Sequence, residues 1–145
     1  MAISLCEVSI SESPLVVLND VQADAGAVLD FFGIVRALEN GREIAGIAYE
    51  AHRAMAEYQL SLIARMAAGT FGLARVEIRH RIGFVAVSEA SVFLRVASEH
   101  RGSSFAGSQW IMDELKSRVP IWKRPVFKNP DVVSMNSGQL SANIA

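Results

Sequence analysis

Cysteine is almost absent from this chain, with Cys6 the only one among 145 residues. A single cysteine excludes an internal disulfide and any cluster of thiolate ligands within one chain. The three histidines, His52, His80 and His100, lie far apart and show none of the HExxH or CxxC spacings that mark metal sites. We therefore expect neither a metal ion nor another cofactor.

An excess of charge of one sign is also lacking. The chain has 14 basic and 15 acidic residues and a net charge of -1, so nothing global attracts it to nucleic acid or to an anionic membrane. Apolar runs such as GIAYEA and IGFVAV are far too short to span a bilayer, and the N-terminus lacks the pattern of a signal peptide. We expect a cytoplasmic protein whose anion sites, if any, are local.

Three nucleotide-binding and hydrolase motifs are missing as well. The sequence has no GxGxxG after an expected strand, no GxxxxGK[ST] and no GxSxG. Dinucleotide-binding, P-loop and esterase functions therefore have no support.

What the chain does have is the composition of a globular protein. Half of its residues are hydrophobic and 20% are charged. We expect one domain over residues 1–133, followed by a polar, flexible tail over residues 134–145, where small and polar residues dominate.

The periodicity of apolar residues predicts strands and helices in an irregular order. Strands are expected at residues 3–10, 27–36, 44–51, 76–82, 84–87, 91–97 and 121–127, and helices at 53–69 and 104–118. A turn at Glu39-Asn40-Gly41 predicts a hairpin, and the strands between the helices read most simply as a meander. Because helices follow groups of strands, the order predicts an α+β fold.

Each expected helix has an apolar stripe that we predict to face the core. In the first helix the stripe ends at Gly69, and in the second Pro120 forbids continuation. The stripe of the first helix is Met55, Tyr58, Leu62 and Met66, and that of the second is Phe105, Ser108, Met112, Leu115 and Val119.

One candidate anion site is the segment ASEHRGSSF, where a strand gives way to a helix. Free backbone N–H groups and hydroxyls at Gly102-Ser103-Ser104, beside the cations of His100-Arg101, would suit a phosphate or a carboxylate. An ordinary helix cap with a solvated arginine explains the same residues.

The other candidate is the stretch VPIWKRPVF, with Lys116 in the helix before it. Trp122 and Lys123 must point to opposite faces of a strand, so burying the indole turns the ammonium outward or into a cleft. Lys116 could instead pair with Asp113 on the surface, and Lys123 could belong to a solvated strand face.

A cluster of cations would change the chemistry of these lysines. If the five basic residues converge, repulsion and burial lower the pKa of a lysine and free its amine as nucleophile or base, and the same cluster binds phosphate. The five are Arg36, Arg101, Lys116, Lys123 and Arg124.

Five segments together resemble the large, catalytic subunit of molybdopterin synthase, over about residues 26–128 and in that family's order and spacing. They are AGAVLDFFGIVR, YEAHRAMAE, HRIG, SEASVFLRVASEHR and IMDELKSRVPIWKR. The resemblance implies an α/β-hammerhead-like α+β fold, with a mixed or antiparallel sheet and two main helices.

The resemblance also implies an activity and an assembly. The family's subunit is a sulfurtransferase that forms a homodimer within a heterotetramer. Its small, ubiquitin-like partner presents a C-terminal Gly-Gly thiocarboxylate as sulfur donor. The substrate is cyclic pyranopterin monophosphate, or precursor Z, which becomes the dithiolene of molybdopterin.

The family's substrate site, carried onto this chain, implies roles for particular residues. Arg36 and Arg101 would hold the phosphate, with His100 and Arg101 reaching across the dimer. Lys116 and Lys123 would stabilise oxyanions and transfer protons, Lys116 lying nearest the glycine tail. The full set is Ile34, Val35, Arg36, His100, Arg101, Lys116, Lys123, Arg124 and Pro125.

Four positions depart from the family's pattern. Pro125 stands where an acid is common, Ser88 where a glycine is usual, Ile34 where a polar residue is common and His52 where a tyrosine is usual. A divergent paralogue, or a non-catalytic module that binds a Gly-Gly tail, remains an alternative. A small RNA-binding domain is another, with Arg79, Arg81, Arg101 and Arg124 as its basic residues.

Overall fold

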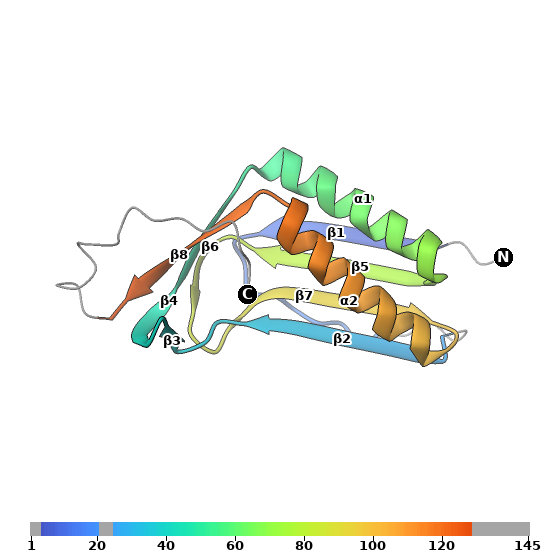
Figure 1. The fold of residues 1–145 in the computed structure, drawn as a ribbon, viewed down its shortest axis with the longest axis horizontal. Coiled ribbons are helices and arrows are strands. Elements are labelled where there is room, and N and C mark those ends of the chain that lie inside the picture. The colour runs from blue at the N-terminus through green and yellow to red at the C-terminus, as the bar shows by residue number, and fades with distance from the viewer. Residues whose placement is uncertain (1–3, 21–24, 129–145) are drawn as a thin grey trace.

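The computed structural model describes residues 4–20 and 25–128, which form two sheets and two helices (Figure 1). Ile3, where the first strand was expected to begin, the predicted domain end at residue 133 and the predicted tail over residues 134–145 lie outside the described residues. In chain order the elements are β1 (Leu5–Ser11), β2 (Ala27–Ile34), β3 (Leu38–Glu39), β4 (Arg42–Ala51), α1 (Arg53–Phe71), β5 (Arg75–Arg81), β6 (Gly83–Ala86), β7 (Ala90–Ser98), α2 (Arg101–Arg118) and β8 (Ile121–Phe127).

The first sheet has the strand order β1-β5-β7-β2, with β1 parallel to β5 and the other pairs antiparallel. The second sheet has the order β3-β4-β6, and β8 pairs with β4. Both helices lie on one face of the first sheet, and the second sheet extends from its end (Figure 1). The predicted α+β fold, with a mixed sheet and two main helices, is confirmed.

The core lies between the helices and the first sheet. Because side chains alternate along a strand, Val76 and Ile78 of β5 point to the helix side, as do Val92, Leu94 and Val96 of β7, and all are fully buried. α1 packs on β1 and β5, and α2 packs on β7 and β2.

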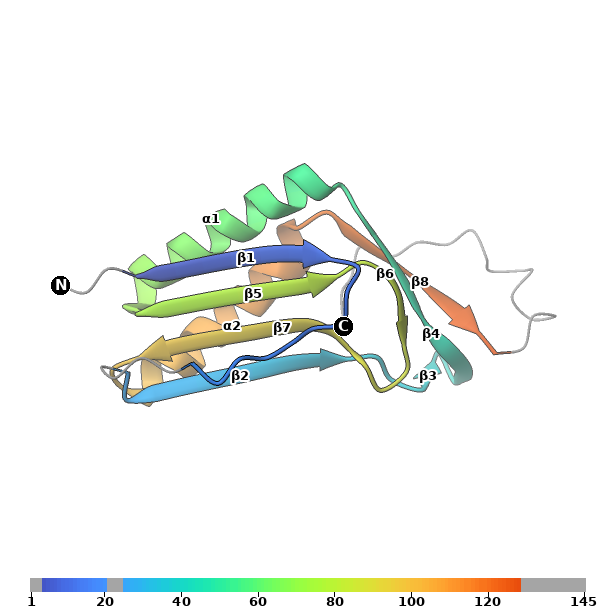
Figure 2. The same ribbon diagram turned by 180° about the vertical axis from the view of Figure 1, so that it is seen from behind.

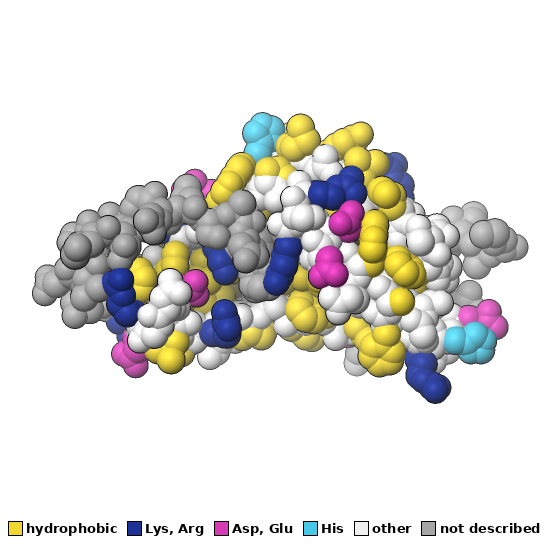
Figure 3. Space-filling model, viewed as in Figure 1, with side chains coloured by type: hydrophobic (Ala, Val, Ile, Leu, Met, Phe, Trp, Pro, Cys, Tyr) yellow, Lys and Arg dark blue, Asp and Glu magenta, His cyan; other side chains and the backbone are white. Residues whose placement is uncertain are grey.

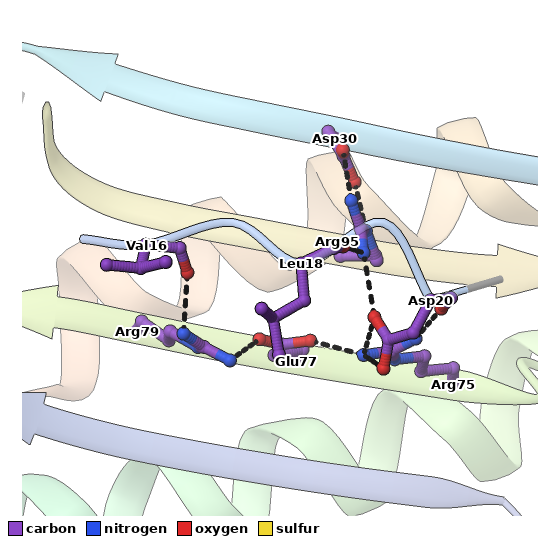
Figure 4. A network of polar contacts seen from close by, with 8 residues as sticks. All are labelled: Val16, Leu18, Asp20, Asp30, Arg75, Glu77, Arg79 and Arg95. Atoms are coloured by element: carbon purple, nitrogen blue, oxygen red, sulfur yellow. Dashed lines mark hydrogen bonds and ion pairs between the residues drawn. The ribbon is translucent and has the colours of Figure 1, made fainter.

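The opposite face of this sheet is covered by the segment after β1, which runs back across it (Figure 2). Three sheet arginines donate to backbone carbonyls of this segment: Arg79 to Val16, Arg95 to Leu18 and Arg75 to Asp20 (Figure 4). We call residues 12–20 the strap. Carboxylates neutralise the buried guanidinium groups, Arg95 pairing with Asp30 at 2.7 Å and Arg75 with Glu77 at 2.7 Å.

The predicted meander between the helices is wrong. β5 pairs with β7, whereas β6, the short strand between them, leaves this sheet and pairs with β4. Gly83, with φ of 82°, turns the chain at that point, a conformation that costs little only for glycine. β6 therefore joins the two sheets.

The predicted inward stripe of α1 is also wrong. Met55, Tyr58 and Met66 are exposed, and the buried face is the smaller one, with Ala56, Leu60, Ile63, Ala64, Ala67 and Ala68. Small side chains allow the helix to approach the sheet closely. α1 continues past Gly69 and ends at a left-handed Gly72.

Other boundaries agree more closely with the predictions. The hairpin is confirmed, with Asn40 and Gly41 both at positive φ in a two-residue turn. α2 begins at Arg101 and ends at Arg118, before Pro120. Its predicted face is buried at Ser108, Met112, Leu115 and Val119, but Phe105 is 60% exposed.

Candidate active site

The end of α2 and the start of β8, which carry the two lysines, lie where the second sheet leaves the first (Figure 1). Lys116 is in the last turn of α2. Pro120 then forces an extended chain, and β8 places Lys123 directly opposite Tyr49 of β4. A helix end and a strand thus bring two amines to one region.

Lys123 is the more unusual of the two because it is buried, with 8% of its surface exposed. Trp122 on the other face is only partly buried. Among the described residues, the ammonium group of Lys123 makes no hydrogen bond or ion pair. The Lys123 side chain therefore lies largely within the protein and not on a solvated strand face.

The charges around Lys123 act on its protonation. Burial lowers the pKa of Lys123 from its usual value, and the nearby charges of Arg36 and Lys116 lower it further, whereas the carboxylate of Glu39 opposes them. Arg36, Lys116 and Lys123 are therefore close enough for their charges to interact. A cluster of cations that includes an amine with a lowered pKa can bind an anion and transfer a proton.

Lys116 is exposed and is not paired with Asp113, which instead accepts a hydrogen bond from Gln109 at 3.1 Å. Lys116 lies beside a groove of about 430 Å³ between α2 and β2. The groove is lined by Leu29, Phe31, Phe105, Ser108, Gln109, Met112, Asp113 and Lys116. Four of these residues are apolar and four are polar, with Lys116 among the polar ones.

Arg36 follows β2 and its side chain is exposed, whereas the preceding residue, Val35, is 2% exposed. The Val35 backbone N–H donates to Glu89 at 3.0 Å, and the Ser88 N–H donates to the Val35 carbonyl at 2.9 Å. Ser88 has φ of 75°, so the position that departs from the family's glycine has a conformation that glycine adopts most easily. Ile34 is exposed, on the edge strand β2.

The pair His100-Arg101 lies at the opposite end of α2 from Lys116. Both side chains are exposed, and the start of the helix has no side-chain cap. Sixteen helical positions separate His100 from Lys116, a distance of about 24 Å. The structure of one chain therefore does not bring this pair to the lysines.

The last two predicted residues lie on either side of β8. Pro125 pairs with Ile47 and shares the face of Lys123, whereas Arg124 pairs with Ala48 and points to the other face. Arg124 therefore does not join the cluster within this chain.

Glu39 was not among the predicted site residues. It is half-buried on β3, and its carboxylate opposes the lowering of the pKa of Lys123. The predicted hairpin could have indicated its position. A two-residue turn at Asn40-Gly41 pairs Glu39 with Arg42 and so determines the face of the sheet on which Glu39 lies.

Lys and Arg side chains gather over the part of the molecule beyond the end of α2, with acidic side chains among them (Figure 3). Over the described ranges, no group of three His, Cys, Asp or Glu residues is arranged to hold a metal ion. Neither described helix is long and apolar enough to cross a membrane.

Two of the arginines considered for RNA binding are neutralised within the chain. Arg79 pairs with Glu77, and Arg81 pairs with Glu89 at 3.0 Å. Because paired guanidinium groups attract phosphate less strongly, these contacts disfavour that alternative.

Known proteins are similar to this chain in sequence and in fold. The family model of the MoaE protein matches residues 7–118. The molybdopterin synthase catalytic subunit of Thermoplasma volcanium is 39% identical over 118 residues, covering 81% of this chain and 86% of the relative. Rice relatives of the same name are 38% identical over 112 residues, and the match spans 77% of this chain but only 58% of their length.

Two solved structures extend the comparison. Molybdopterin synthase from Staphylococcus aureus has a TM-score of 0.75 at 28% identity, covering 83% of this chain and 90% of that one. A complex of subunits 1 and 2 of molybdopterin-converting factor from Helicobacter pylori has a TM-score of 0.61 at 20% identity, covering 74% of each chain, and supports the fold alone. Since the family model matches more than half of the residues, the chain belongs to the MoaE protein family, whose relatives are molybdopterin synthase catalytic subunits.

Proposed function

We propose that this chain is the catalytic subunit of a molybdopterin synthase. It transfers sulfur from the C-terminal thiocarboxylate of a small ubiquitin-like partner to cyclic pyranopterin monophosphate, forming the dithiolene of molybdopterin. The observation that carries the proposal is the buried amine of Lys123, with the charges of Arg36 and Lys116 beside it.

The cluster suits the charges of this reaction. The substrate carries a phosphate, and oxyanions form as sulfur replaces oxygen, so cations held in place stabilise both the substrate and the transition state. Burial lowers the pKa of Lys123, which makes its proton easier to release than that of an exposed lysine. A dithiolene contains two sulfur atoms, so two thiocarboxylates become carboxylates for each product.

The groove between α2 and β2 supports the role of the partner. Lys116 is one of the residues that line the groove, and Phe31 and Met112 are among its apolar lining residues. A C-terminal Gly-Gly tail has no side chains and would bring its terminal thiocarboxylate to the amine. In the Helicobacter pylori structure the two subunits form a complex, which is consistent with such a partner.

A dimer of this chain would complete the site. His100-Arg101 lies too far from Lys116 within one chain, as the length of α2 requires. A second copy related by a two-fold axis would place its His100 and Arg101 beside Lys116 and Arg36. The active assembly is then a heterotetramer of two such chains and two small partners.

The proposal predicts the effect of removing each amine. Lys116→Ala and Lys123→Ala are expected to lower product formation at least a hundredfold in an assay with thiocarboxylated partner and precursor Z, because each removes charge stabilisation or proton transfer. Lys128→Ala, in the residue after β8, is the matched control and should retain activity. Near-normal turnover in both site variants would contradict the assignment.

The same assay separates the main alternative. A non-catalytic module would bind the partner's Gly-Gly tail through the groove without forming a dithiolene. Binding of the partner by the wild-type chain, with no product from thiocarboxylate and precursor Z, would favour that alternative.

A further inference from the structure

We propose that Glu89 is a positioning residue for Arg36, acting through the turn at residues 86–89 between β6 and β7. Its side chain, paired with Arg81, fixes this turn, and the turn fixes the backbone that carries Arg36. The contacts that support the proposal lie within one chain. Only the catalytic consequence rests on the proposed function.

The turn is closed by both the backbone and the side chain of Glu89. The Glu89 N–H donates to the Ala86 carbonyl at 3.0 Å, and the Ala86 N–H donates to Oε1 of Glu89 at 3.2 Å. The Val87 N–H donates to the Ala45 carbonyl at 3.1 Å, which ties the turn to β4. Ser88 has φ of 75°, a conformation that a residue other than glycine keeps only where its surroundings hold it.

Arg81 connects this turn to the first sheet. It is the last residue of β5, an inner strand that pairs with both β1 and β7. Its side chain is 9% exposed, and its Nη1 donates to Oε1 of Glu89 at 3.0 Å, while Nη2 donates to the Phe84 carbonyl at 3.5 Å. The same carboxylate oxygen thus accepts from a guanidinium group fixed in the sheet and from the backbone of the turn.

The turn in turn holds the residue before Arg36. The Val35 N–H donates to the Glu89 carbonyl at 3.0 Å, and the Ser88 N–H donates to the Val35 carbonyl at 2.9 Å. The pairing of β2 with β7 is irregular just before this point, so these two bonds place Val35 where the regular ladder ends. Figure 1 shows the turn beside the connection from β2 to β3.

The backbone matters for Arg36 because its side chain is exposed. Within residues 4–20 and 25–128, the guanidinium group of Arg36 forms no hydrogen bond or ion pair. On its other side, the Ala37 carbonyl accepts from the Ile44 N–H at 3.0 Å. The place of this cation in the cluster around Lys123 is therefore set by the backbone bonds on its two sides.

Amide exchange measured by NMR tests the link from the side chain of Glu89 to this backbone. In Glu89→Gln, the amide protons of Val35 and Ser88 should exchange about tenfold faster or more, because the turn opens locally. The Ile44 amide, on the other side of Arg36, should keep its rate. A general loss of stability would instead accelerate all three.

A second variant keeps the test valid if Glu89→Gln, which leaves a buried cation unpaired, does not fold. Arg81→Met breaks the same ion pair and leaves the Glu89 side chain, which is 51% exposed, in contact with water. It should give the same pattern of exchange. The matched control is Glu57→Gln, which removes an exposed carboxylate paired with Arg53 on α1 at 3.4 Å and should change none of the three rates.

The catalytic arm separates positioning from a purely structural role. Since Arg36 is proposed to hold the phosphate, Glu89→Gln should raise the KM for precursor Z about tenfold, with a smaller change in kcat and none in the KM for the partner. A structural defect alone would lower the amount of active enzyme, and so the apparent kcat, at unchanged KM. In an Arg36→Ala background, Glu89→Gln should raise the KM no further.

Two results would overturn the proposal. One is exchange at Val35 and Ser88 that is unchanged in both variants or accelerated equally at Ile44. The other is an undiminished effect of Glu89→Gln in the Arg36→Ala background. Because exchange needs no substrate, the expected pattern in a chain without synthase activity would contradict the proposed function and support the role of Glu89 in holding the turn.

Discussion

Burial affects Lys123 and His80 in the same direction, since a charged group loses hydration when it leaves water. For Lys123 the loss is part of the proposed chemistry. His80 is fully buried on β5, its ring lies edge-on to Tyr49, and its Nδ1 is 2.6 Å from the Arg81 carbonyl oxygen. Its Nε2 has no partner among the described residues, so the neutral ring with a proton on Nδ1 is the form that fits.

His80 predicts a loss of stability in mild acid. Burial lowers its pKa from 6.5 to about 4, so the unfolded chain takes up the proton at a higher pH than the folded one. Its contribution is full above the unfolded value and is lost as the pH falls from 6.5 toward 4, by about 3 kcal/mol in total. Urea unfolding between pH 7 and pH 4 should show this decrease.

The control for His80 compares slopes and not absolute stabilities. His80→Gln has no proton to gain, so its free energy of unfolding should fall less steeply with decreasing pH than that of the wild type. Parallel curves for wild type and His80→Gln would refute this account.

Which parts of the elements could be predicted depends on how local their causes are. Pro120 and the Asn40-Gly41 turn act on their own backbone, and both boundaries were predicted. α1 has apolar residues on two sides, so periodicity alone did not distinguish the exposed stripe with Tyr58 from the buried stripe with Leu60. The alanine-rich side of α1 faces the sheet because its small side chains allow close packing.

Contacts between distant segments were less predictable. β6 pairs with β4, which precedes it by a whole helix, and no local signal distinguishes this from a meander. The lysines were identified as candidates from the sequence, but the position of Lys123 depends on the pairing of β8 with β4, which is distant in the chain. The strap was not foreseen either, because its carbonyls bind arginines about 55 to 77 positions away.

The strap predicts a strong effect of one buried arginine. Arg95 is 3% exposed, donates to both oxygens of Asp30 and also holds the Leu18 carbonyl of the strap. Arg95→Met removes the cation and leaves a carboxylate and a carbonyl unpaired, which should lower the free energy of unfolding by about 3 kcal/mol. Urea denaturation measures the loss, and amide exchange should increase in residues 12–20.

Arg118 gives the matched comparison for Arg95. It pairs with Glu114 at 3.0 Å one helical turn away, but its side chain is 35% exposed. An exposed pair of this kind contributes at most about 0.5 kcal/mol, so Arg118→Met should be nearly neutral. Equal losses in the two variants would show that the strap does not depend on Arg95.

At the scale of the whole molecule, β2 forms an edge of the first sheet. This edge strand pairs only with β7 among the described strands, and it exposes Val28, Phe32 and Ile34. An apolar sheet edge favours pairing with another chain. A second copy paired there by a two-fold axis runs antiparallel, so the start of its α2 lies near the end of α2 in the first copy.

Such a dimer predicts that two inactive variants restore activity when they are mixed, which a site built within one chain would not allow. Arg101→Ala and Lys116→Ala should each be inactive as homodimers, because each damages both sites. In a mixed dimer, one site lacks both Arg101 and Lys116. The other site keeps both residues and is fully active. After equal mixing and subunit exchange, half of the dimers are mixed, and activity should return to about a quarter of the wild-type value.

A mixture of Lys116→Ala with Lys123→Ala is the control, since both changes fall on the cluster of one chain and each site of their mixed dimer lacks one lysine. Recovery in the first mixture but not in the second would place Arg101 across the subunit boundary, whereas no recovery in either would place Arg101 in the site of its own chain and contradict the dimer.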